Sequence, residues 1–536
     1  MDPRRTVDLA HALRSFSRAG LLDLRRPDQP ALLRWELRRW GAQAASVRAA
    51  ARRHGDGIAL VDDLGELSFT ELDRRSDALC LAWRGLGLDE RSVVAVLCRD
   101  HRWLLDSLFA AAKLGATALL LNTGSAGPQL ADIARGEGVT AIVHDEEFAE
   151  AVGHLPREIP RFTAWTDEPP PGGLGVAPRI DLAALIRRAP SGRPRPPGRA
   201  GAIVLLTSGT TGPPKGAPRR VRSLDAVAQL LDRVPWRARE ATLVASPLFH
   251  GTGLAHALLA ISLGSTLVLQ RRFDAARTVR LAAEHRCTAL VLVPTMLHRI
   301  LALGPVDDAD LSRLRIVLSA GSALSPDLVV RALDRFGDVL YNLYGSTEVA
   351  TATVARPHEL RRAPGTAGRC PRGCRIRLYD EDDRPIDRPN VQGRIFVTNG
   401  TRFDGYTGGG SRQVLDGLMS TGDVGHFDED GLLFVDGRDD DMIVSGGENV
   451  FPGEIEDLLS SHPGIEEAVV VPVPDAEFGR RLKAFVVPAP GSRLTPEEVR
   501  EYVRGSLARH KVPRDVVLVD DLPRTPTGKV LRRALT

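Results

Sequence analysis

Cysteine is scarce in this sequence: the chain of 536 residues contains five cysteines, an odd number scattered along its length. A disulfide framework is therefore not expected, and a reducing cytosol fits better. Cys370 and Cys374 lie close together, but no second cysteine or histidine pair accompanies them to complete a zinc site. We predict a cytoplasmic protein without structural disulfides or structural zinc.

Long hydrophobic runs and a strong excess of one charge are also missing. The best candidate for a membrane span, residues 114–121, is short and follows Lys113, so no transmembrane segment is predicted. No signal peptide is expected, because residues 1–5 are followed by mixed polar residues. The formal net charge is +3, and the arginines of residues 193–197 have no interleaved aromatic residues, so no nucleic-acid partner is expected.

What is present is an alternation of apolar runs typical of strands with segments typical of helices. Strands are expected at 58–62, 67–69, 93–97 and 116–121, and again at 242–245, 266–269, 289–293 and 316–319. We predict an α/β fold of layered, mostly parallel subdomains, as if two related units were packed together. A chain of 536 residues exceeds a single core, so at least two domains are expected.

Capping residues predict the ends of two helices. Thr70 is expected to cap one helix, with Asp73 in the capping-box position. Ser325 and Pro326 favour the start of another in the cap and first-turn positions, and Gly337 favours its end.

Two segments differ from the strand and helix pattern. Residues 1–50 are rich in arginine, leucine and alanine, and are expected to be helical and docked on the main domain. A basic amphipathic helix can also lie on a membrane, so peripheral membrane contact stays open. Residues 151–200 carry proline, glycine and arginine runs that cannot bury a core, and are expected to form a loop or linker.

The most informative stretch, residues 205–216, reads L-L-T-S-G-T-T-G-P-P-K-G after an apolar run expected to be a buried strand. Glycines let the backbone approach an anion, and the hydroxyls and lysine suit phosphate. These residues are Thr207, Ser208, Gly209, Thr210, Thr211, Gly212 and Lys215. The Walker A pattern fails where Pro214 and Gly216 stand, so a P-loop NTPase is excluded. A glycine-rich surface turn is the remaining alternative.

Three further segments carry residues suited to a nucleotide, although each alone would be an ordinary solvated loop. N-L-Y-G-S-T-E contains Tyr344, whose ring offers a face for a base, and Glu348, a carboxylate for a hard cation such as Mg²⁺. S-T-G-D ends in Asp423, a carboxylate suited to a ribose diol. P-R-T-P-T-G-K-V-L-R contains Lys529 beside a glycine turn.

In this order, the segments resemble the motifs of the adenylate-forming superfamily, which includes acyl-CoA synthetases, luciferases and adenylation domains of peptide synthetases. Residues 435–449 are similar to the family segment that joins two domains, and the likeness runs from about residue 60 to residue 533. The resemblance implies a large N-terminal AMP-binding domain of layered α/β subdomains, residues 1–440, with residues 1–50 as a helical extension. It also implies a small mobile α+β C-terminal domain, residues 441–536, that carries the catalytic lysine.

The resemblance further implies a role for each matching residue. ATP phosphates would be held by Thr207, Ser208, Gly209, Thr210, Thr211, Gly212 and Lys215, and the adenine and acyl sites would be bordered by Gly321, Ser322, Ala323, Tyr344, Gly345 and Ser346. The ribose would be bound by Asp423 and Arg438, Mg²⁺ by Glu348 and Thr207, and the α-phosphate by Thr347. Asp440 would be the hinge, Gly446 and Gly447 would face CoA, and the catalytic set would be Lys529, His250, Thr347 and Glu348.

The implied chemistry explains these residue types. A carboxylate attacks the α-phosphorus of ATP while pyrophosphate leaves, and because both partners are anions the site must supply positive charge and positioning. Mg²⁺ and Lys529 would supply that charge. A thiol then displaces AMP, and because Lys529 occupies the approach in the first step, the small domain must swing between steps. ATP, Mg²⁺ and coenzyme A are thus implied.

The acid itself is indicated by the segment S-P-L-F-H-G-T-G-L-A-H. In relatives that activate amino acids an acidic residue holds the substrate ammonium; the nearest equivalent here is Gly251, so α-amino acids are disfavoured. Gly251, Gly253, Leu254 and Ala255 instead suggest a roomy apolar channel with His250 at its mouth. A medium- or long-chain fatty acid is predicted. Ser322 and Ala323 depart from the glycine and proline common in relatives, which leaves the channel's shape open.

The leading interpretation is therefore a fatty acyl-CoA synthetase, an AMP-forming acid–thiol ligase. An acyl-AMP ligase that loads a carrier protein is the alternative within the fold. Such enzymes often carry an insertion that hinders domain rotation, and none is evident near Asp440. A non-catalytic scaffold is a further alternative, and the sequence keeps a set of residues that argues against it: Thr347, Glu348, Asp423, Arg438 and Lys529.

Overall fold

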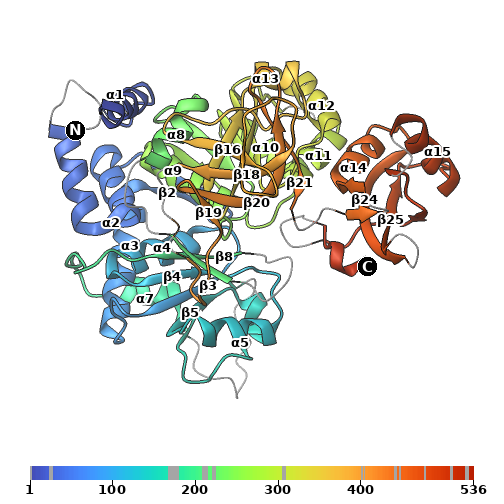
Figure 1. Ribbon diagram of the computed structural model, residues 1–536. Coiled ribbons are helices and arrows are strands. Elements are labelled where there is room, and N and C mark those ends of the chain that lie inside the picture. Colours follow the sequence, from blue (N-terminus) through green and yellow to red (C-terminus); the bar gives the residue numbers. More distant parts are fainter. Residues whose placement is uncertain are drawn as a thin grey trace.

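The computed structural model places two large, mostly parallel sheets, an antiparallel sheet and a C-terminal α+β unit along the chain (Figure 1). The residues described are 3–22, 28–166, 180–207, 215–219, 225–304, 309–399, 403, 405–439, 443–445, 448–475, 479–507, 511–524 and 530–535. A large N-terminal part followed by a smaller C-terminal one confirms the predicted α/β fold class. The proposed domain boundary after residue 440 lies outside the described residues.

The first large sheet has the strand order β7-β6-β5-β3-β4-β8-β9. Its strands are β3 (Val93–Leu97), β4 (Thr117–Leu120), β5 (Ala141–His144), β6 (Arg161–Thr163), β7 (Ile180–Asp181), β8 (Ile203–Thr207) and β9 (Lys215–Arg219). Neighbouring strands pair in parallel, except β8 and β9, which pair antiparallel on either side of the proposed phosphate loop. Helices cover both faces of such a sheet, which explains why its central strands are almost uninterrupted apolar runs.

The second large sheet has the order β15-β14-β13-β12-β10-β11-β1-β2, parallel in its centre and antiparallel at both edges. Its strands are β1 (Ile58–Asp62), β2 (Gly65–Ser68), β10 (Ala241–Val244), β11 (Thr266–Val268), β12 (Ala289–Leu292), β13 (Ile316–Ala320), β14 (Leu340–Ser346) and β15 (Ala350–Ala355). The carboxyl ends of β13 and β14 lie side by side, because Ala320 pairs with Leu343. This edge carries several of the predicted site residues.

Helices follow most of these strands. They are α3 (Phe69–Gly85), α4 (Arg102–Leu114), α5 (Gly127–Gly136), α6 (Ala149–Val152), α7 (Leu182–Arg188), α8 (Asp225–Arg233), α9 (Gly251–Ser262), α10 (Ala275–Glu284), α11 (Pro294–Ala302), α12 (Pro326–Phe336) and α13 (Pro357–Arg362). The expectation of a loop throughout 151–200 is wrong, because β6, β7 and α7 lie there and bury Phe162 and Leu182 completely. The proline and glycine runs of this segment suggested a loop, so the short strands and the helix were not predicted.

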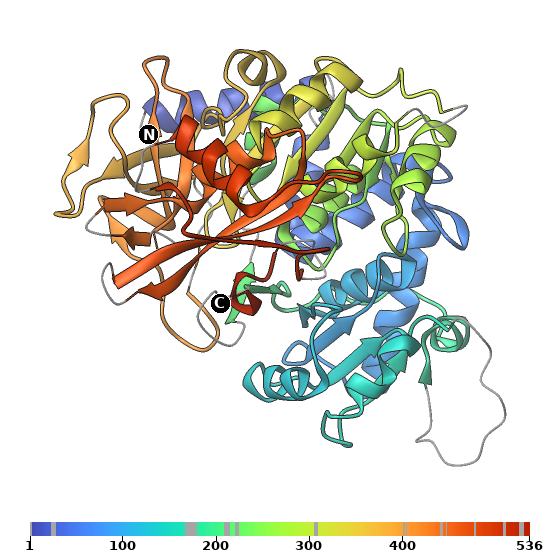
Figure 2. The same ribbon diagram turned by 90° about the vertical axis from the view of Figure 1, so that its right-hand side faces the viewer.

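The remaining strands form smaller sheets. An antiparallel sheet contains β16 (Arg375–Tyr379), β17 (Pro385–Ile386), β18 (Gly393–Thr398), β19 (Val414–Leu415), β20 (Leu418–Phe427) and β21 (Leu433–Arg438). The C-terminal unit contains β22 (Ile443–Ser445), β23 (Glu448–Val450), α14 (Pro452–Ser460), β24 (Ile465–Asp475), β25 (Gly479–Pro488), α15 (Pro496–Ser506) and β26 (Asp515–Leu518). Its α14 contacts α12 and β21, and the unit stands in front of the larger part in Figure 2.

Two N-terminal helices, α1 (Pro3–Arg18) and α2 (Asp28–His54), dock on the larger part. Helix α1 contacts α8, while α2 contacts α3, α4 and α9 and is interrupted at Gly41, whose φ is 74°. Phe16 and Leu21 belong to the main core. None of the helices in the described ranges is long and apolar enough to cross a membrane.

The predicted cap of α3 is displaced by two residues. Ser68, not Thr70, is the cap, and Glu71 completes the capping box. Asp73, predicted for that position, is buried and instead accepts a hydrogen bond of 2.6 Å from Nζ of Lys113 on α4. The predicted start and end of α12 at Ser325, Pro326 and Gly337 are confirmed.

Candidate functional site

The residues proposed for adenine and ribose meet where the carboxyl ends of β14 and β21 lie beside the middle of β20. Asp423 and Arg438 face each other across the β20–β21 pairing, with 3.6 Å between Arg438 Nε and Asp423 Oδ1. Tyr344, on β14, donates a hydrogen bond of 2.6 Å from its hydroxyl to Asp423 Oδ2. Burial, and then the charge of Asp423, raise the pKa of Tyr344 well above its ordinary value. A neutral phenol thus fixes the orientation of the carboxylate proposed to bind ribose.

The carboxylate of Glu348 lies nearby and is buried and ionised. Its Oε1 accepts a hydrogen bond of 2.5 Å from the Tyr406 hydroxyl, and its Oε2 one of 2.9 Å from Ser346 Oγ. Arg412 Nη2 lies 3.5 Å from Oε1. Burial by itself would raise the pKa of Glu348, but the hydrogen bonds from Tyr406 and Ser346 and the charge of Arg412 together hold it below its ordinary value. A buried anionic carboxylate is a ligand that suits Mg²⁺.

A glycine is required between these two groups. A Cβ atom on Gly345 would stand 1.8 Å from the carbonyl oxygen of Ala350, on the neighbouring strand β15. The β14–β15 register shifts at this point, between Tyr344 and Gly345. Gly345 therefore allows the close turn that directs Tyr344 and Glu348 to the same edge, without itself needing to touch a ligand.

A loop that the sequence interpretation missed connects this edge to the end of the phosphate loop. The backbone N–H of Thr407 donates to the carbonyl of Gly216 at 2.9 Å. The Nζ atom of Lys215 lies 5.4 Å from the ring centre of Tyr406, within reach of a cation–π contact. Tyr406 therefore stands between the proposed phosphate lysine and Glu348. Its only sequence signal is its place within a glycine-rich segment that also contains Arg412.

Part of the predicted set is not tested by the geometry. Ser208, Gly209, Thr210, Thr211, Gly212, Asp440, Gly446, Gly447 and Lys529 lie outside the described residues. Thr207 is described only as the end of β8, where its backbone pairs with Lys215. The metal role proposed for Thr207 and the catalytic role proposed for Lys529 stay predictions. Thr347 is partly exposed beside Glu348, at the edge where the α-phosphate is expected.

The residues proposed for the acid lie on α9 and on the loop after β13. His250 precedes α9 without capping it through its side chain, and burial lowers its pKa to about 4, so the imidazole is neutral at neutral pH. Its Nε2 atom has no hydrogen-bond partner among the described residues. The loop Gly321–Ser322–Ala323 is exposed and follows β13, next to the strand of Tyr344.

Gly251 and Gly253, the two glycines of the proposed channel, differ in the space around them. A Cβ on Gly251 would meet Leu205 Cδ1 at 3.7 Å, an ordinary contact, so this glycine leaves room beside an apolar side chain. A Cβ on Gly253 would meet the carbonyl oxygen of Ser246 at 2.3 Å. Gly253 is therefore required by the packing of α9 against the preceding loop, and its proposed place in an acyl channel stays a prediction.

The loop that precedes α9 is fixed by a buried acid, Asp100, which the sequence interpretation did not single out. Asp100 Oδ1 accepts a hydrogen bond of 2.9 Å from the backbone N–H of Leu248. Burial raises the pKa of Asp100 to about 7. Asp100 follows β3 of the first sheet, whereas Leu248 follows β10 of the second, so this bond joins the two sheets beside His250.

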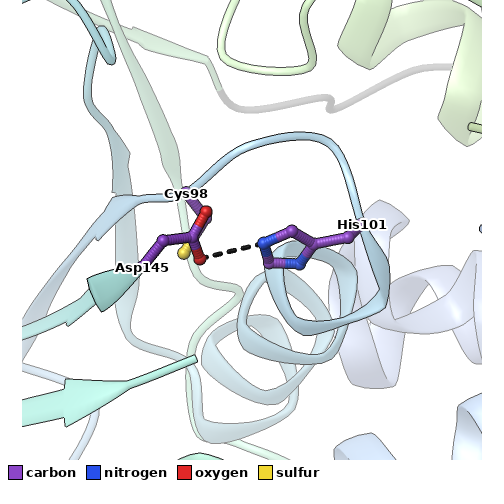
Figure 3. Close-up of side chains that lie close together, drawn as sticks. All are labelled: Cys98, His101 and Asp145. Atoms are coloured by element: carbon purple, nitrogen blue, oxygen red, sulfur yellow. Dashed lines mark hydrogen bonds and ion pairs between the residues drawn. The ribbon is translucent and has the colours of Figure 1, made fainter. Parts of the chain in front are cut away.

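A separate group of possible metal ligands lies at the end of β3 (Figure 3). Within the described residues it is the one such cluster found, and it comprises Cys98, His101 and Asp145, all buried. Asp145 Oδ1 lies 2.9 Å from His101 Nε2, and Oδ2 accepts the backbone N–H of Arg99 at 2.9 Å. Burial raises the pKa of the Cys98 thiol well above its ordinary value. Asp145 thus has partners for both of its oxygens, while His101 Nδ1 is buried without a hydrogen-bond partner among the described residues. Because the Asp145 carboxylate is already occupied, we explain the cluster as a join between β3 and β5 and not as a metal centre.

Comparison with known proteins gives one consistent family. The profile described as AMP-binding enzyme matches residues 47–407, and that described as AMP-binding enzyme C-terminal domain matches residues 454–529. An indoleacetate–CoA ligase of Aromatoleum aromaticum is 35% identical over 477 residues, covering 87% of this chain and 92% of the relative. The fatty acid–[acyl-carrier-protein] ligase ScoC of Streptomyces coeruleorubidus is 31% identical over 495 residues, covering 88% and 91%. The solved anthranilate CoA ligase AuaEII in complex with anthranoyl-AMP has a TM-score of 0.83 and 25% identity, covering 93% of this chain and 97% of that one.

Proposed function

The chain belongs to the AMP-binding enzyme family, and we propose that it joins an apolar carboxylic acid to coenzyme A through an acyl-adenylate. The observation that carries the proposal is the polar corner where Tyr344 and Arg438 contact Asp423, beside the buried ionised Glu348. A scaffold without activity would have no use for an anionic carboxylate kept buried at this point, because burial of a charge destabilises the fold unless it is compensated. The matched relatives are named as acid–CoA or acid–carrier ligases.

The proposed reaction has two steps. An oxygen of the substrate carboxylate bonds to the α-phosphorus of ATP while the bond to pyrophosphate breaks. The sulfur of the thiol then bonds to the acyl carbon, and AMP leaves. Tyr344 and Asp423 would orient the nucleoside, and Lys215 and Thr347 would contact the phosphates. Lys529, on the small domain of residues 441–536, would stabilise the first transition state and then withdraw about a hinge at Asp440.

The residues present fit Mg²⁺ as the metal of the first step. Glu348 is an oxygen ligand that is already ionised, and Ser346 holds it in one orientation. When bound there, Mg²⁺ supplies positive charge to the phosphate oxygens. The hydrogen bond from Tyr406 and the positive charge of Arg412 keep the same carboxylate ionised in the absence of the ion.

For the acid, a medium- or long-chain fatty acid is the first candidate. It rests on Gly251, which leaves room beside Leu205, and on the absence of a carboxylate there to hold an ammonium. An aromatic acid is the second candidate, supported by the indoleacetate–CoA and anthranilate–CoA ligases among the relatives. A carrier protein in place of coenzyme A is the alternative thiol, supported by the likeness to ScoC. A cytoplasmic location is part of the proposal.

The test is acid-dependent exchange of pyrophosphate into ATP, followed by mass spectrometry of thioesters formed with coenzyme A. Octanoate, palmitate, indoleacetate, benzoate and leucine form the panel. Exchange with at least one apolar acid, and no exchange above background with leucine, is expected. No exchange with any acid would overturn the proposal, whereas exchange without CoA thioester would favour the carrier-protein alternative.

The two proposed steps are separated by Lys529→Ala. Removing one preorganised charged group at a transition state costs roughly a hundred- to a thousandfold in rate. The variant should lose adenylation to that extent and still convert chemically made acyl-adenylate and CoA to thioester. Asp440→Pro, which restricts the proposed hinge, should do the reverse. Equal loss of both steps in Lys529→Ala would contradict the two-position mechanism.

A further inference from the structure

The first half of α2 presents an unusual outer face. Leu32 is 47% and Trp35 48% exposed, one helical turn apart on the same helix. Trp35 is the only aromatic among the large apolar side chains found exposed in the described ranges. The helix lies at one side of the molecule, in blue in Figure 1, and its inner face is packed through Leu33, Leu37 and Trp40. The exposed pair is therefore not needed for docking.

The exposed charges on this face are mostly positive, with Asp28 in the first turn of α2 as the one exposed acid among residues 28–39. Arg34, Arg38 and Arg39 are exposed between and beside the two apolar side chains. The other acid within this stretch, Glu36, is completely buried and pairs with Arg52 on the inner side, so it does not neutralise them. The guanidinium of Arg39 lies 5.1 Å from the ring centre of Trp35. Helices that rest on membranes combine exposed aromatic and aliphatic residues with arginines in this way.

We propose that this face of α2, comprising Leu32, Arg34, Trp35, Arg38 and Arg39, binds the surface of an anionic lipid bilayer. Trp35 and Leu32 would enter the boundary between headgroups and acyl chains, and the arginines would stay among the headgroups. The charge pattern favours lipid over a second copy of the chain, because two such cationic faces would repel each other. The proposal does not depend on the proposed reaction, and its test contains neither ATP nor an acid.

The test is co-sedimentation of the full-length protein with large vesicles. Vesicles of equal parts phosphatidylglycerol and phosphatidylcholine should bind the protein, and vesicles of phosphatidylcholine alone should bind it much less. Each arginine near an anionic surface contributes roughly fivefold to partitioning. Arg34→Glu with Arg38→Glu should therefore weaken binding by roughly 25-fold or more, and Leu32→Ser with Trp35→Ser by on the order of tenfold.

A matched control comes from another exposed pair. Val391 is 41% exposed and Arg388 is exposed on the same loop, in the antiparallel sheet region. Val391→Ser with Arg388→Glu should leave vesicle binding unchanged. Because all these side chains are exposed, the variants should unfold at the temperature of the wild type, and this is checked by circular dichroism.

A second measurement places the helix in the bilayer. Vesicles with brominated acyl chains should quench part of the tryptophan fluorescence, and Trp35→Phe should still bind while losing most of that quenching. Of the other five tryptophans, Trp40, Trp83 and Trp236 are buried, and Trp103 and Trp165 are half-buried beneath arginine side chains. Absence of binding to anionic vesicles would overturn the proposal. So would equal binding by the α2 variants and the control, or lipid-free self-association that the same α2 substitutions abolish.

Discussion

On the nucleotide side of the candidate site, the carboxylates of Glu348 and Asp423 each accept a hydrogen bond and face an arginine. On the acid side, the buried Nε2 of His250 has no hydrogen-bond partner among the described residues, and Gly251 leaves room beside an apolar leucine. Polar groups that contact one another fix a single geometry, whereas an apolar surface adapts to the shape of its ligand. If the proposed function holds, we expect a site built this way to bind one nucleotide strictly and to allow the acid to vary.

The strongest test of that contrast is Glu348→Gln. Loss of the buried negative charge should lower adenylation on the order of a hundred- to a thousandfold at limiting Mg²⁺, because an electrostatic contact to the reacting groups is removed. The measurement is pyrophosphate exchange at graded Mg²⁺ concentrations. Glu429→Gln, an exposed acid, is the control. A wild-type rate for Glu348→Gln at limiting Mg²⁺ would remove Glu348 from the metal role.

A smaller effect is expected for Asp423→Asn. The variant keeps an acceptor for the Tyr344 hydroxyl but loses its charge, so the KM for ATP should rise on the order of tenfold, as for loss of a charge-assisted hydrogen bond. The KM for the acid should stay within about twofold of the wild-type value. A change in the acid KM alone would show that the two sides of the site are not separate.

The acid side is tested by Gly251→Val. Its first carbon would make an ordinary contact with Leu205, so the fold should tolerate the change. The branched side chain would occupy the room that the proposed acid uses, and kcat/KM for the best acid should fall roughly tenfold. The KM for ATP should not change. Octanoate and palmitate are compared with benzoate, and an unchanged preference would place the acid elsewhere.

The smallest effect on activity is expected at the join beside His250, where the change is one of stability. Since burial raises the pKa of Asp100 to about 7 from an unfolded value of about 3.9, the folded state holds the proton more tightly. The resulting stabilisation is complete below the unfolded pKa and is lost as pH rises through about 7. Asp100→Asn keeps an acceptor for Leu248 without charge, so it should be more stable than the wild type at pH 8, by at most roughly 4 kcal/mol, and similar near pH 4. Chemical denaturation midpoints across this range measure the difference, and parallel pH profiles would contradict it.

The sequence alone predicts the α/β layers, because they rest on a local pattern, and it assigns Tyr344 and Asp423 to one nucleotide site, because both lie in chain-order motifs. It does not predict the hydrogen bond between them. The predicted phosphate loop stays a prediction, since residues 208–214 lie outside the described residues. Tyr406 and Arg412 were missed, since their importance comes from contact with Glu348 across the fold. The cap at Thr70 was misplaced for a similar reason: Asp73 has the right spacing for a capping box, but Lys113 from another helix takes its carboxylate. Local sequence patterns cannot predict a hydrogen-bond or ion-pair partner that is brought close only by the tertiary structure.

The hydrogen bond from Tyr406 to Glu348 has a consequence for the order of events at the site. An ion that arrives alone must compete with the phenol and with Arg412 for the same oxygen, Oε1. Nucleotide phosphates that bind Lys215 would move its Nζ atom away from the Tyr406 ring. This would disturb the loop of Tyr406, because Thr407 in that loop is hydrogen-bonded to Gly216, next to Lys215. We therefore expect the free protein to have little affinity for Mg²⁺ and to acquire the ion together with the nucleotide.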